Sequence, residues 1–196
     1  MNTQTNIIEP KKEWKSQLLT IPNLLSLIRL AMIPVIICLY CIKQEAVWTA
    51  VLLVLSGATD LVDGYIARRF NQITDIGKAL DPIADKLTQL AMLWCLVTNH
   101  PRMIVPFLLL LAKEIITGIM SLIVIKKTTE VNGADWHGKI CTVMLYGMMV
   151  LHVLWPQMPS VFSLTTIVAC VVMMIFSFVM YGRRNLNALK ATNPKA

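Results

Sequence analysis

Residues 60–85 read DLVDGYIARRFNQITDIGKALDPIAD. Four aspartates in this stretch recur at helical spacing: Asp60 with Asp63, and Asp81 with Asp85. Long apolar runs lie on both sides, so these acids sit close to segments that suit a lipid bilayer. An ionised side chain at membrane depth costs a few kcal/mol unless it is paired or bound to a cation. The stretch therefore predicts a functional site in a membrane protein.

The composition favours an integral membrane protein. The chain has 196 residues, of which 56% are hydrophobic and 15% are charged. A soluble domain carries about 25% charged residues. The apolar residues form long runs rather than alternating patterns, which predicts an all-α, polytopic membrane protein with one domain.

Six apolar runs predict six transmembrane helices. We place them at residues 24–42, 48–67, 77–97, 103–125, 140–155 and 161–181. The predicted domains are a polar N-terminal segment with a short interfacial helix (1–19), a six-helix transmembrane domain (20–184) and a tail (185–196). Residues 126–139 are expected to form the longest loop. Pro82 marks either the start of the third span or a kink in it.

The net charge of +7 is interpreted through the positions of the basic residues. They cluster beside the apolar runs, which favours contacts with anionic lipids over binding to nucleic acid. Six spans put both termini on one side, and only Lys43 and Arg102 of the 18 Lys and Arg then fall opposite. The positive-inside rule therefore predicts a protein of the cytoplasmic membrane with both termini and the acidic stretch on the cytoplasmic side.

The spacing of the acids predicts a metal site. Asp60 and Asp63 share one helix face, and Asp81 and Asp85 share another. Small residues on both helices would allow a close approach that gathers the four carboxylates. Clustered carboxylates suit hard divalent cations such as Mg²⁺ or Mn²⁺. Two such ions, with Arg68 beside them as a phosphate ligand, would suit displacement at phosphorus.

The stretch also resembles the signature of the CDP-alcohol phosphatidyltransferases, D-x-x-D-G-x-x-A-R-x8-G-x3-D-x3-D. The fixed positions are Asp60, Asp63, Gly64, Ala67, Arg68, Gly77, Asp81 and Asp85. The resemblance implies a homodimeric membrane enzyme with six transmembrane helices and two metals. Such an enzyme transfers a substituted phosphate from a CDP-linked donor, here CDP-diacylglycerol, to an alcohol and releases CMP.

The resemblance also implies roles for individual residues. Asp60, Asp63 and Asp81 are implied to be metal ligands. Asp85 is implied to contact the metal site and to act as the general base for the acceptor's hydroxyl group. The implied ligands of the CDP portion are Thr59, Asp60, Gly64, Arg68 and Gly77.

Further resemblances bear on the acceptor. Residues 20–29 (TIPNLLSLIR) and 79–87 (ALDPIADKL) resemble both bacterial phosphatidylglycerophosphate synthases and cardiolipin synthases of this superfamily. Lys113 and Lys139 resemble basic positions of the former group and would bind the phosphate of glycerol 3-phosphate. Arg29 either extends to the membrane interface or faces an anionic ligand.

Several alternatives stay open from the sequence. Residues 120–121 are Met-Ser where the glycerophosphate enzymes commonly carry an arginine, so phosphatidylglycerol, inositol phosphate and serine stay open as acceptors. A divalent-cation transporter is the alternative from another class. It would favour acids spread along a pore and repeated halves. Cys38 and Cys41 form a lone C-x-x-C, which we assign to apolar packing. We assign no specific role to His137.

Overall fold

The computed structural model describes residues 21–69, 75–128 and 136–192, and every regular element in these ranges is helical. The elements are α2 (Ile21–Ile37), the π-helical turn η1 (Cys38–Ile42), α3 (Ala46–Arg69), α4 (Asp75–Asn99), the 3-10 turn η2 (Pro101–Met103), α5 (Ile104–Thr128), α6 (Trp136–Leu154) and α7 (Ser160–Thr192). An α-helix lies at each of the six predicted positions, so the all-α prediction is confirmed for the described residues. The predicted interfacial helix within 1–19 lies outside them.

Some helices extend further than their apolar runs. Within the predicted loop 126–139, α5 continues to Thr128 and α6 begins at Trp136. Lys139 therefore belongs to the first turn of α6 and not to a loop. Similarly, α7 continues past residue 184 to Thr192. Hydrogen bonding along a helix does not stop where the apolar residues stop, which is why these sequence-based boundaries were too short. Pro82 lies inside α4, which excludes it as the helix start.

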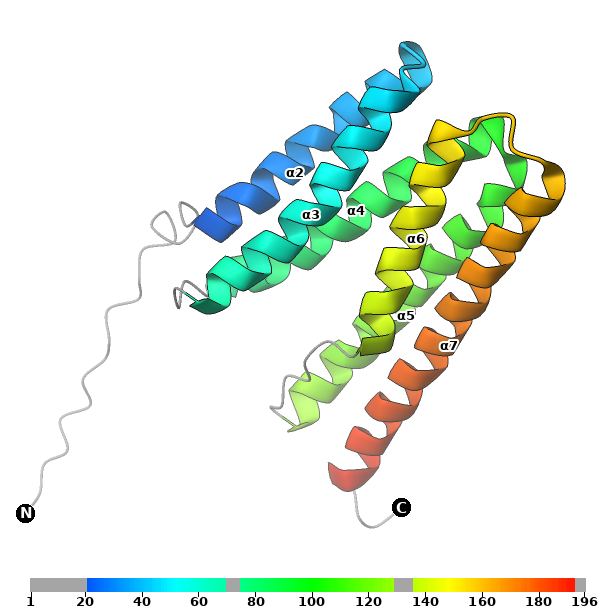
Figure 1. Ribbon diagram of the computed structural model, residues 1–196. Helices are drawn as coiled ribbons and strands as arrows, with labels where there is room; N and C mark the ends of the chain where they lie inside the picture. Colours follow the sequence, from blue (N-terminus) through cyan, green and yellow to red (C-terminus); the bar gives the residue numbers. More distant parts are fainter. Residues whose placement is uncertain (1–20, 70–74, 129–135, 193–196) are drawn as a thin grey trace, which may run out of the picture.

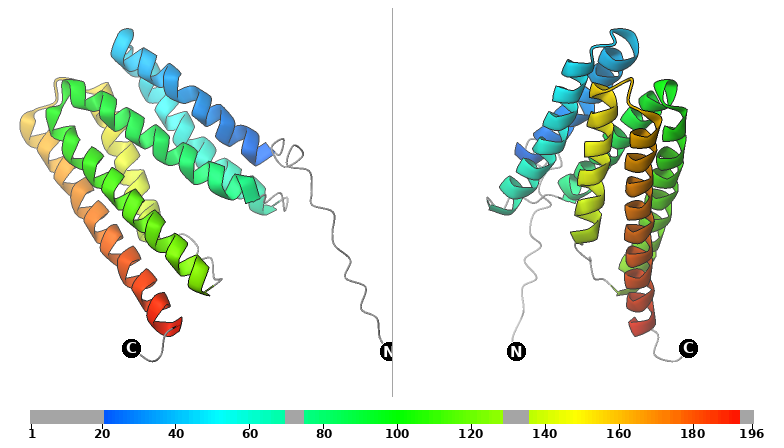
Figure 2. Two further views of the ribbon diagram at one scale, coloured as in Figure 1. Left: turned by 180° about the vertical axis from the view of Figure 1, so that it is seen from behind. Right: turned by 45° about the vertical axis from the view of Figure 1, so that its right-hand side comes forward.

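The helices pack in two groups (Figures 1 and 2). Helices α2, α3 and α4 contact one another, and α7 packs against both α5 and α6. Contacts of α3 with α6, and of α4 with α5 and α6, join the two groups. The start of α2, the end of α3 and the start of α4 lie at the same end of the molecule as the end of α5, the start of α6 and the end of α7 (Figure 1). We call this the motif end, because residues 60–69 and 75–85 lie there.

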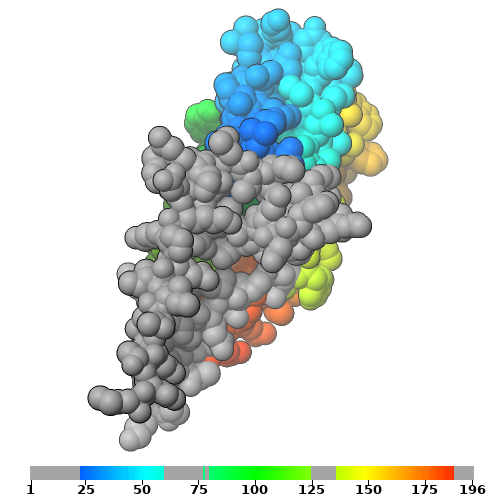
Figure 3. Space-filling view, turned by 90° about the vertical axis from the view of Figure 1, so that its left-hand side faces the viewer, coloured from blue at the N-terminus to red at the C-terminus, as the bar shows by residue number. Residues whose placement is uncertain are grey.

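The core is apolar and the outer surface is apolar as well. Leu53, Leu93, Leu96 and Met149 are fully buried where the helices meet. Large apolar side chains also cover the outside, and Figure 3 shows α2 and α3 presenting one continuous face. An apolar exterior of this extent is unfavourable in water and suits contact with lipid.

In the part of the chain that the structure describes, four helices are long and apolar enough to cross a membrane. These candidate spans are Asn23–Ile42, Pro101–Val124, Trp136–Leu154 and Ser160–Asn187. Helix α3 contributes a shorter apolar stretch, Ala46–Thr59, and α4 carries charged side chains in its first half. The protein is therefore a multi-pass helical membrane protein. The count of six spans stays a prediction.

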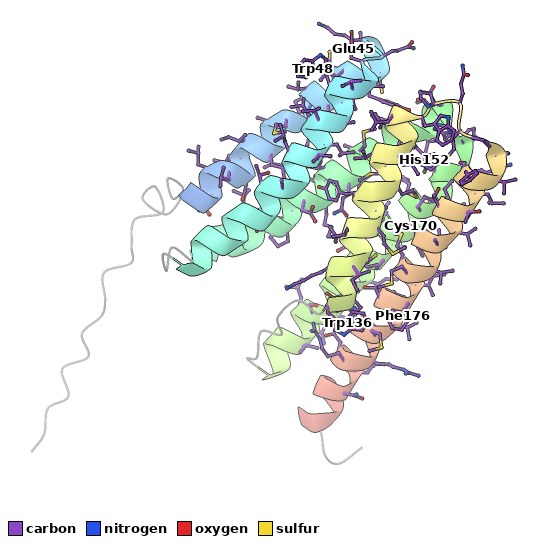
Figure 4. All side chains as sticks on the ribbon, viewed as in Figure 1. Glu45, Trp48, Trp136, His152, Cys170 and Phe176 are labelled. Atoms are coloured by element: carbon purple, nitrogen blue, oxygen red, sulfur yellow. The ribbon has the colours of Figure 1, made fainter. Side chains whose placement is uncertain are left out.

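Tryptophans lie at both ends of the bundle. Figure 4 shows Trp48 beside Glu45 at one end and Trp136 at the other. Both tryptophans are exposed. Tryptophan prefers the boundary between lipid and water, so this placement fits the two edges of a bilayer.

Candidate active site

The acidic stretch occupies the end of α3 and the first half of α4. The two helices contact each other and their connected ends lie together at the motif end (Figure 1). The side chains of Asp60, Asp63, Gly64 and Arg68 lie outside the described ones, so the gathering of four carboxylates stays a prediction. Asp81 and Asp85 are described. Gly77 lies one turn before Asp81 on α4, as predicted from the spacing.

Asp81 is held by α2. The Ser26 hydroxyl donates to Asp81 Oδ1 over 3.2 Å, and Arg29 Nη1 donates to the same oxygen over 3.3 Å. Arg29 is 0% exposed, whereas the Asp81 side chain is 34% exposed. Arg29 therefore does not extend to the membrane interface; it faces an anionic side chain inside the fold. This pairing joins a predicted acceptor ligand to a predicted metal ligand.

Asp85 lies deeper and has more partners. It is 6% exposed. Gln89 Nε2 donates to Oδ1 and Oδ2 over 3.0 and 2.9 Å, and the Tyr146 hydroxyl donates to Oδ1 over 3.1 Å. Lys86 Nζ lies 3.4 Å from Oδ2. These donors hold the carboxylate in one orientation.

Sequence reasoning missed Ser26, Gln89 and Tyr146. Gln89 could have been predicted, because residues four apart on a helix lie on one face and Gln89 follows Asp85 by four. Ser26 lies on the same helix face as Arg29 by its spacing of three. Tyr146 gave no signal, since it lies in an apolar run of α6 and reaches Asp85 only through tertiary packing.

A line of charges connects Asp85 to α5. Lys86 lies 3.4 Å from Asp85 and 3.7 Å from Glu114, and Glu114 lies 2.6 Å from Lys113 Nζ. Lys113 is 8% exposed. We call Asp85, Lys86, Glu114 and Lys113 the charge network. It connects a predicted acceptor ligand, Lys113, to the predicted base, Asp85, through three successive ion pairs, whose alternating signs offset the cost of burial.

Other predicted residues are not brought into this network. The Thr59 hydroxyl donates to the carbonyl of Ser56 in its own helix over 2.8 Å. Lys139 is exposed on the first turn of α6 and, among the described residues, forms no ion pair with the network. His137 is buried, with its Nδ1 3.3 Å from the hydroxyl of Ser177. This contact gives His137 a packing role between α6 and α7.

The described side chains fit part of a metal site. Among the described side chains, which do not include those of Asp60 and Asp63, no group of three or more His, Cys, Asp or Glu gathers around one point. Both described donors to Asp81 contact Oδ1, and a carboxylate offers about four acceptor positions over its two oxygens. Asp81 therefore keeps acceptor capacity for a cation. Asp85 already accepts from Gln89, Tyr146 and Lys86, so a metal there would replace one of these donors.

The fold and this site define a class: a multi-pass helical membrane protein with carboxylates and basic side chains buried together near one end of its bundle. Comparison of the sequence with family models identifies the family. The CDP-alcohol phosphatidyltransferase model matches residues 19–179, which is most of the chain. The protein belongs to the CDP-alcohol phosphatidyltransferase family, whose members use divalent metals.

Curated relatives share this family. The chain is 39% identical over 112 residues to a CDP-diacylglycerol–glycerol-3-phosphate 3-phosphatidyltransferase of Rickettsia bellii, which covers 56% of this chain and 62% of the relative. An enzyme of the same name from Bacillus subtilis is 30% identical over 192 residues, or 88% of this chain and 98% of the relative. A cardiolipin synthase (CMP-forming) of Streptomyces coelicolor is 39% identical over 109 residues, or 53% and 51%.

Proposed function

We propose that the protein transfers the phosphatidyl group of CDP-diacylglycerol to sn-glycerol 3-phosphate, giving phosphatidylglycerophosphate and CMP. The observation that carries this proposal is Asp85, a buried carboxylate with its orientation fixed by Gln89, Tyr146 and Lys86. A base that must take a proton from an alcohol needs this fixed geometry. The Bacillus subtilis relative, which aligns over nearly its whole length, supports the choice of acceptor.

The proposed reaction assigns a task to each group. Asp85 takes the proton of the acceptor's hydroxyl group, whose oxygen attacks the phosphorus that carries diacylglycerol. The bond from that phosphorus to the bridging oxygen breaks, and CMP leaves. Gln89 and Tyr146 keep the carboxylate of Asp85 aimed at the acceptor. In this proposal Thr59, Asp60, Gly64, Arg68 and Gly77 bind the cytidine diphosphate portion.

Divalent ions complete the proposed site. We assign their binding to Asp60, Asp63, Asp81 and Asp85, as two Mg²⁺ or Mn²⁺ ions, because carboxylate oxygens are the ligands these hard cations prefer. When bound, they supply positive charge that offsets the charge of the diphosphate. Arg29 and Ser26 orient Asp81 from α2 for this purpose.

The acceptor site is assigned to Lys113, Lys139 and Arg29. Of these three residues, Lys113 belongs to the charge network that includes Asp85, and its ammonium group would bind the phosphate of glycerol 3-phosphate. The match to a cardiolipin synthase keeps phosphatidylglycerol as the second candidate acceptor. None of the relatives described supports inositol phosphate or serine as the acceptor. Membership of a transferase family argues against the alternative of a divalent-cation transporter.

The proposed setting is the cytoplasmic membrane. We infer that α3 and α4 also cross the bilayer, which gives six spans, because their lengths match those of the four apolar helices and they pack between them. The motif end then faces the cytoplasm by the positive-inside rule, where the soluble acceptor is found. A homodimer is expected from the family resemblance.

An acceptor-by-acceptor assay tests the proposal. Purified protein in detergent would receive CDP-diacylglycerol and Mg²⁺ or Mn²⁺, with glycerol 3-phosphate, phosphatidylglycerol, inositol phosphate or serine added separately. We expect CMP release with glycerol 3-phosphate. CMP release only with phosphatidylglycerol would mean that this lipid, and not glycerol 3-phosphate, is the acceptor. No CMP release with any alcohol or metal would reject the proposed activity.

Replacing Lys113 is expected to weaken acceptor binding. Lys113→Met keeps the buried chain length and removes the charge, so KM for glycerol 3-phosphate should rise about 10- to 100-fold, the value of one charge-assisted hydrogen bond. Steady-state kinetics with varied acceptor would measure it. Lys43→Met, an exposed lysine at the opposite end, is the matched control. An unchanged KM in Lys113→Met would remove Lys113 from the acceptor site.

Removing the Tyr146 hydroxyl is expected to slow the chemical step. Tyr146→Phe loses one hydrogen bond to Asp85, so kcat should fall about tenfold while KM for both substrates stays constant. Tyr40→Phe is a matched control, because the Tyr40 hydroxyl accepts a hydrogen bond from Asn99 over 3.0 Å at the opposite end. Equal losses in both variants would mean that the effect is structural and does not act through Asp85.

A further inference from the structure

One carboxylate oxygen holds the two halves of the charge network together. Glu114 Oε1 lies 2.6 Å from Lys113 Nζ and 3.7 Å from Lys86 Nζ. Lys113 precedes Glu114 on α5, whereas Lys86 lies on α4, so the ion pair between Lys86 and Glu114 joins the two helices. This single oxygen atom therefore sets how far apart the two ammonium groups lie.

Each of the two lysines belongs to a different part of the proposed site. Lys86 Nζ lies 3.4 Å from Asp85 Oδ2 and donates to Gln89 Oε1 over 3.4 Å. It thus contacts both the proposed base and the amide that orients this base. Lys113 is the proposed ligand of the acceptor's phosphate. Asp85 and Lys113 are both nearly buried, so contacts inside the bundle determine where each of them lies.

The proposed acceptor would be held at two points, its phosphate at Lys113 and its attacking hydroxyl group at Asp85. In glycerol 3-phosphate three carbon atoms separate this hydroxyl group from the phosphate. A fixed distance between the two points favours an acceptor of matching length, because a reacting group misplaced by about 1 Å costs roughly 100-fold in rate. One methylene group in a confined site is likewise worth about tenfold or more in discrimination.

We propose that Glu114 is a positioning residue that selects the length of the acceptor. Its Oε1 fixes the spacing between Lys113 and, through Lys86, the base Asp85. The site thereby prefers acceptors with three carbon atoms between hydroxyl group and phosphate. Glu114 acts through the two lysines and does not touch the acceptor. This inference rests on the proposed function, which supplies both ends of the acceptor.

A series of acceptors that differ only in length tests the inference. Hydroxyethyl, hydroxypropyl and hydroxybutyl phosphate place two, three and four carbon atoms between a terminal hydroxyl group and the phosphate. The purified full-length protein in detergent would receive CDP-diacylglycerol, Mg²⁺ or Mn²⁺ and each acceptor in turn, and kcat/KM for CMP release would be measured. We expect the wild-type protein to prefer the three-carbon acceptor about tenfold or more over the other two.

Two substitutions of Glu114 separate spacing from charge. Glu114→Gln removes the charge but keeps the length, and its amide oxygen still accepts from both lysines, so the preference for three carbons should stay. Glu114→Asp keeps the charge but withdraws the carboxylate by one methylene group, so the preference should fall below about threefold. Lys86→Met removes one end of the same contact without changing Glu114 and should also lower the preference. Glu45→Asp, at an exposed position at the opposite end, is the matched control.

Each outcome of this experiment decides about Glu114. A preference lost in Glu114→Gln but kept in Glu114→Asp would assign the effect to charge and overturn the spacing role. An equal preference in all variants, with changes only in the free energy of unfolding, would leave Glu114 a purely structural residue. Wild-type CMP release with glycerol 3-phosphate but without a length preference would overturn the inference and leave the proposed function intact. No CMP release from the wild-type protein with any acceptor would reject the proposed function and, with it, this role.

Discussion

Asp85→Asn is expected to lower the rate of CMP release about a thousandfold, within the range by which a positioned general base accelerates a reaction. The amide keeps the shape of the carboxylate but cannot take a proton from the acceptor. Its oxygen still accepts from Tyr146, and Gln89 can rotate its amide so that its oxygen accepts from the new NH2 group, which replaces the 3.4 Å hydrogen bond that this oxygen accepts from Lys86. The fold should therefore survive the change, and the loss should fall on the chemical step.

Single-turnover CMP release at saturating substrates would measure this loss. Glu45→Gln makes the same acid-to-amide change at the exposed turn between α2 and α3, at the end opposite the motif, and should leave the rate unchanged (Figure 4). Asp85→Asn with more than a tenth of the wild-type rate would reject Asp85 as the base. Full recovery at high Mg²⁺ would limit its role to metal binding.

The sequence predicted the helices well and their ends less well. Long apolar runs determine where helices form in lipid, so all six positions are occupied by helices. The runs say little about where helices end, because backbone hydrogen bonding continues into the interface. For that reason Lys139 was placed in a loop although it lies in the first turn of α6.

The candidate site was only partly predictable, for a related physical reason. The helical period alone places Asp81 and Asp85 on one face of α4. Which side chains approach that face from other helices depends on how the helices pack, and the sequence carries no local signal for it. Arg29 was identified as an unusual charge, but its partner Asp81 lies 52 residues away. Tyr146 was hidden because a tyrosine in an apolar run is usually a packing residue.

The charges within the helix bundle constrain which substitutions the protein tolerates. Glu114 lies between two ammonium groups, 2.6 Å from Lys113 and 3.7 Å from Lys86. Lys113 is nearly buried, whereas Glu114 is 27% exposed. Loss of Glu114 therefore leaves a buried cation without its nearest anion. A buried pair broken on one side costs several kcal/mol, more than the pair contributes relative to an apolar replacement of both partners.

Glu114→Gln should consequently lower the free energy of unfolding by about 2 kcal/mol, somewhat less than for a fully buried pair because Glu114 is partly exposed. In Lys113→Met/Glu114→Gln the uncompensated cation is absent, so the double variant should be more stable than the sum of the single changes predicts. The coupling energy should be about 1–3 kcal/mol, which reversible unfolding of the four proteins in mixed micelles would measure. Lys43→Met/Glu45→Gln, both at exposed positions, should be additive. Additivity at 113 and 114 as well would mean that the pair is screened by solvent.

The double variant should still show the raised KM for glycerol 3-phosphate, since restored stability does not restore the missing ammonium group. Stability and acceptor binding would thereby be separated at a single lysine.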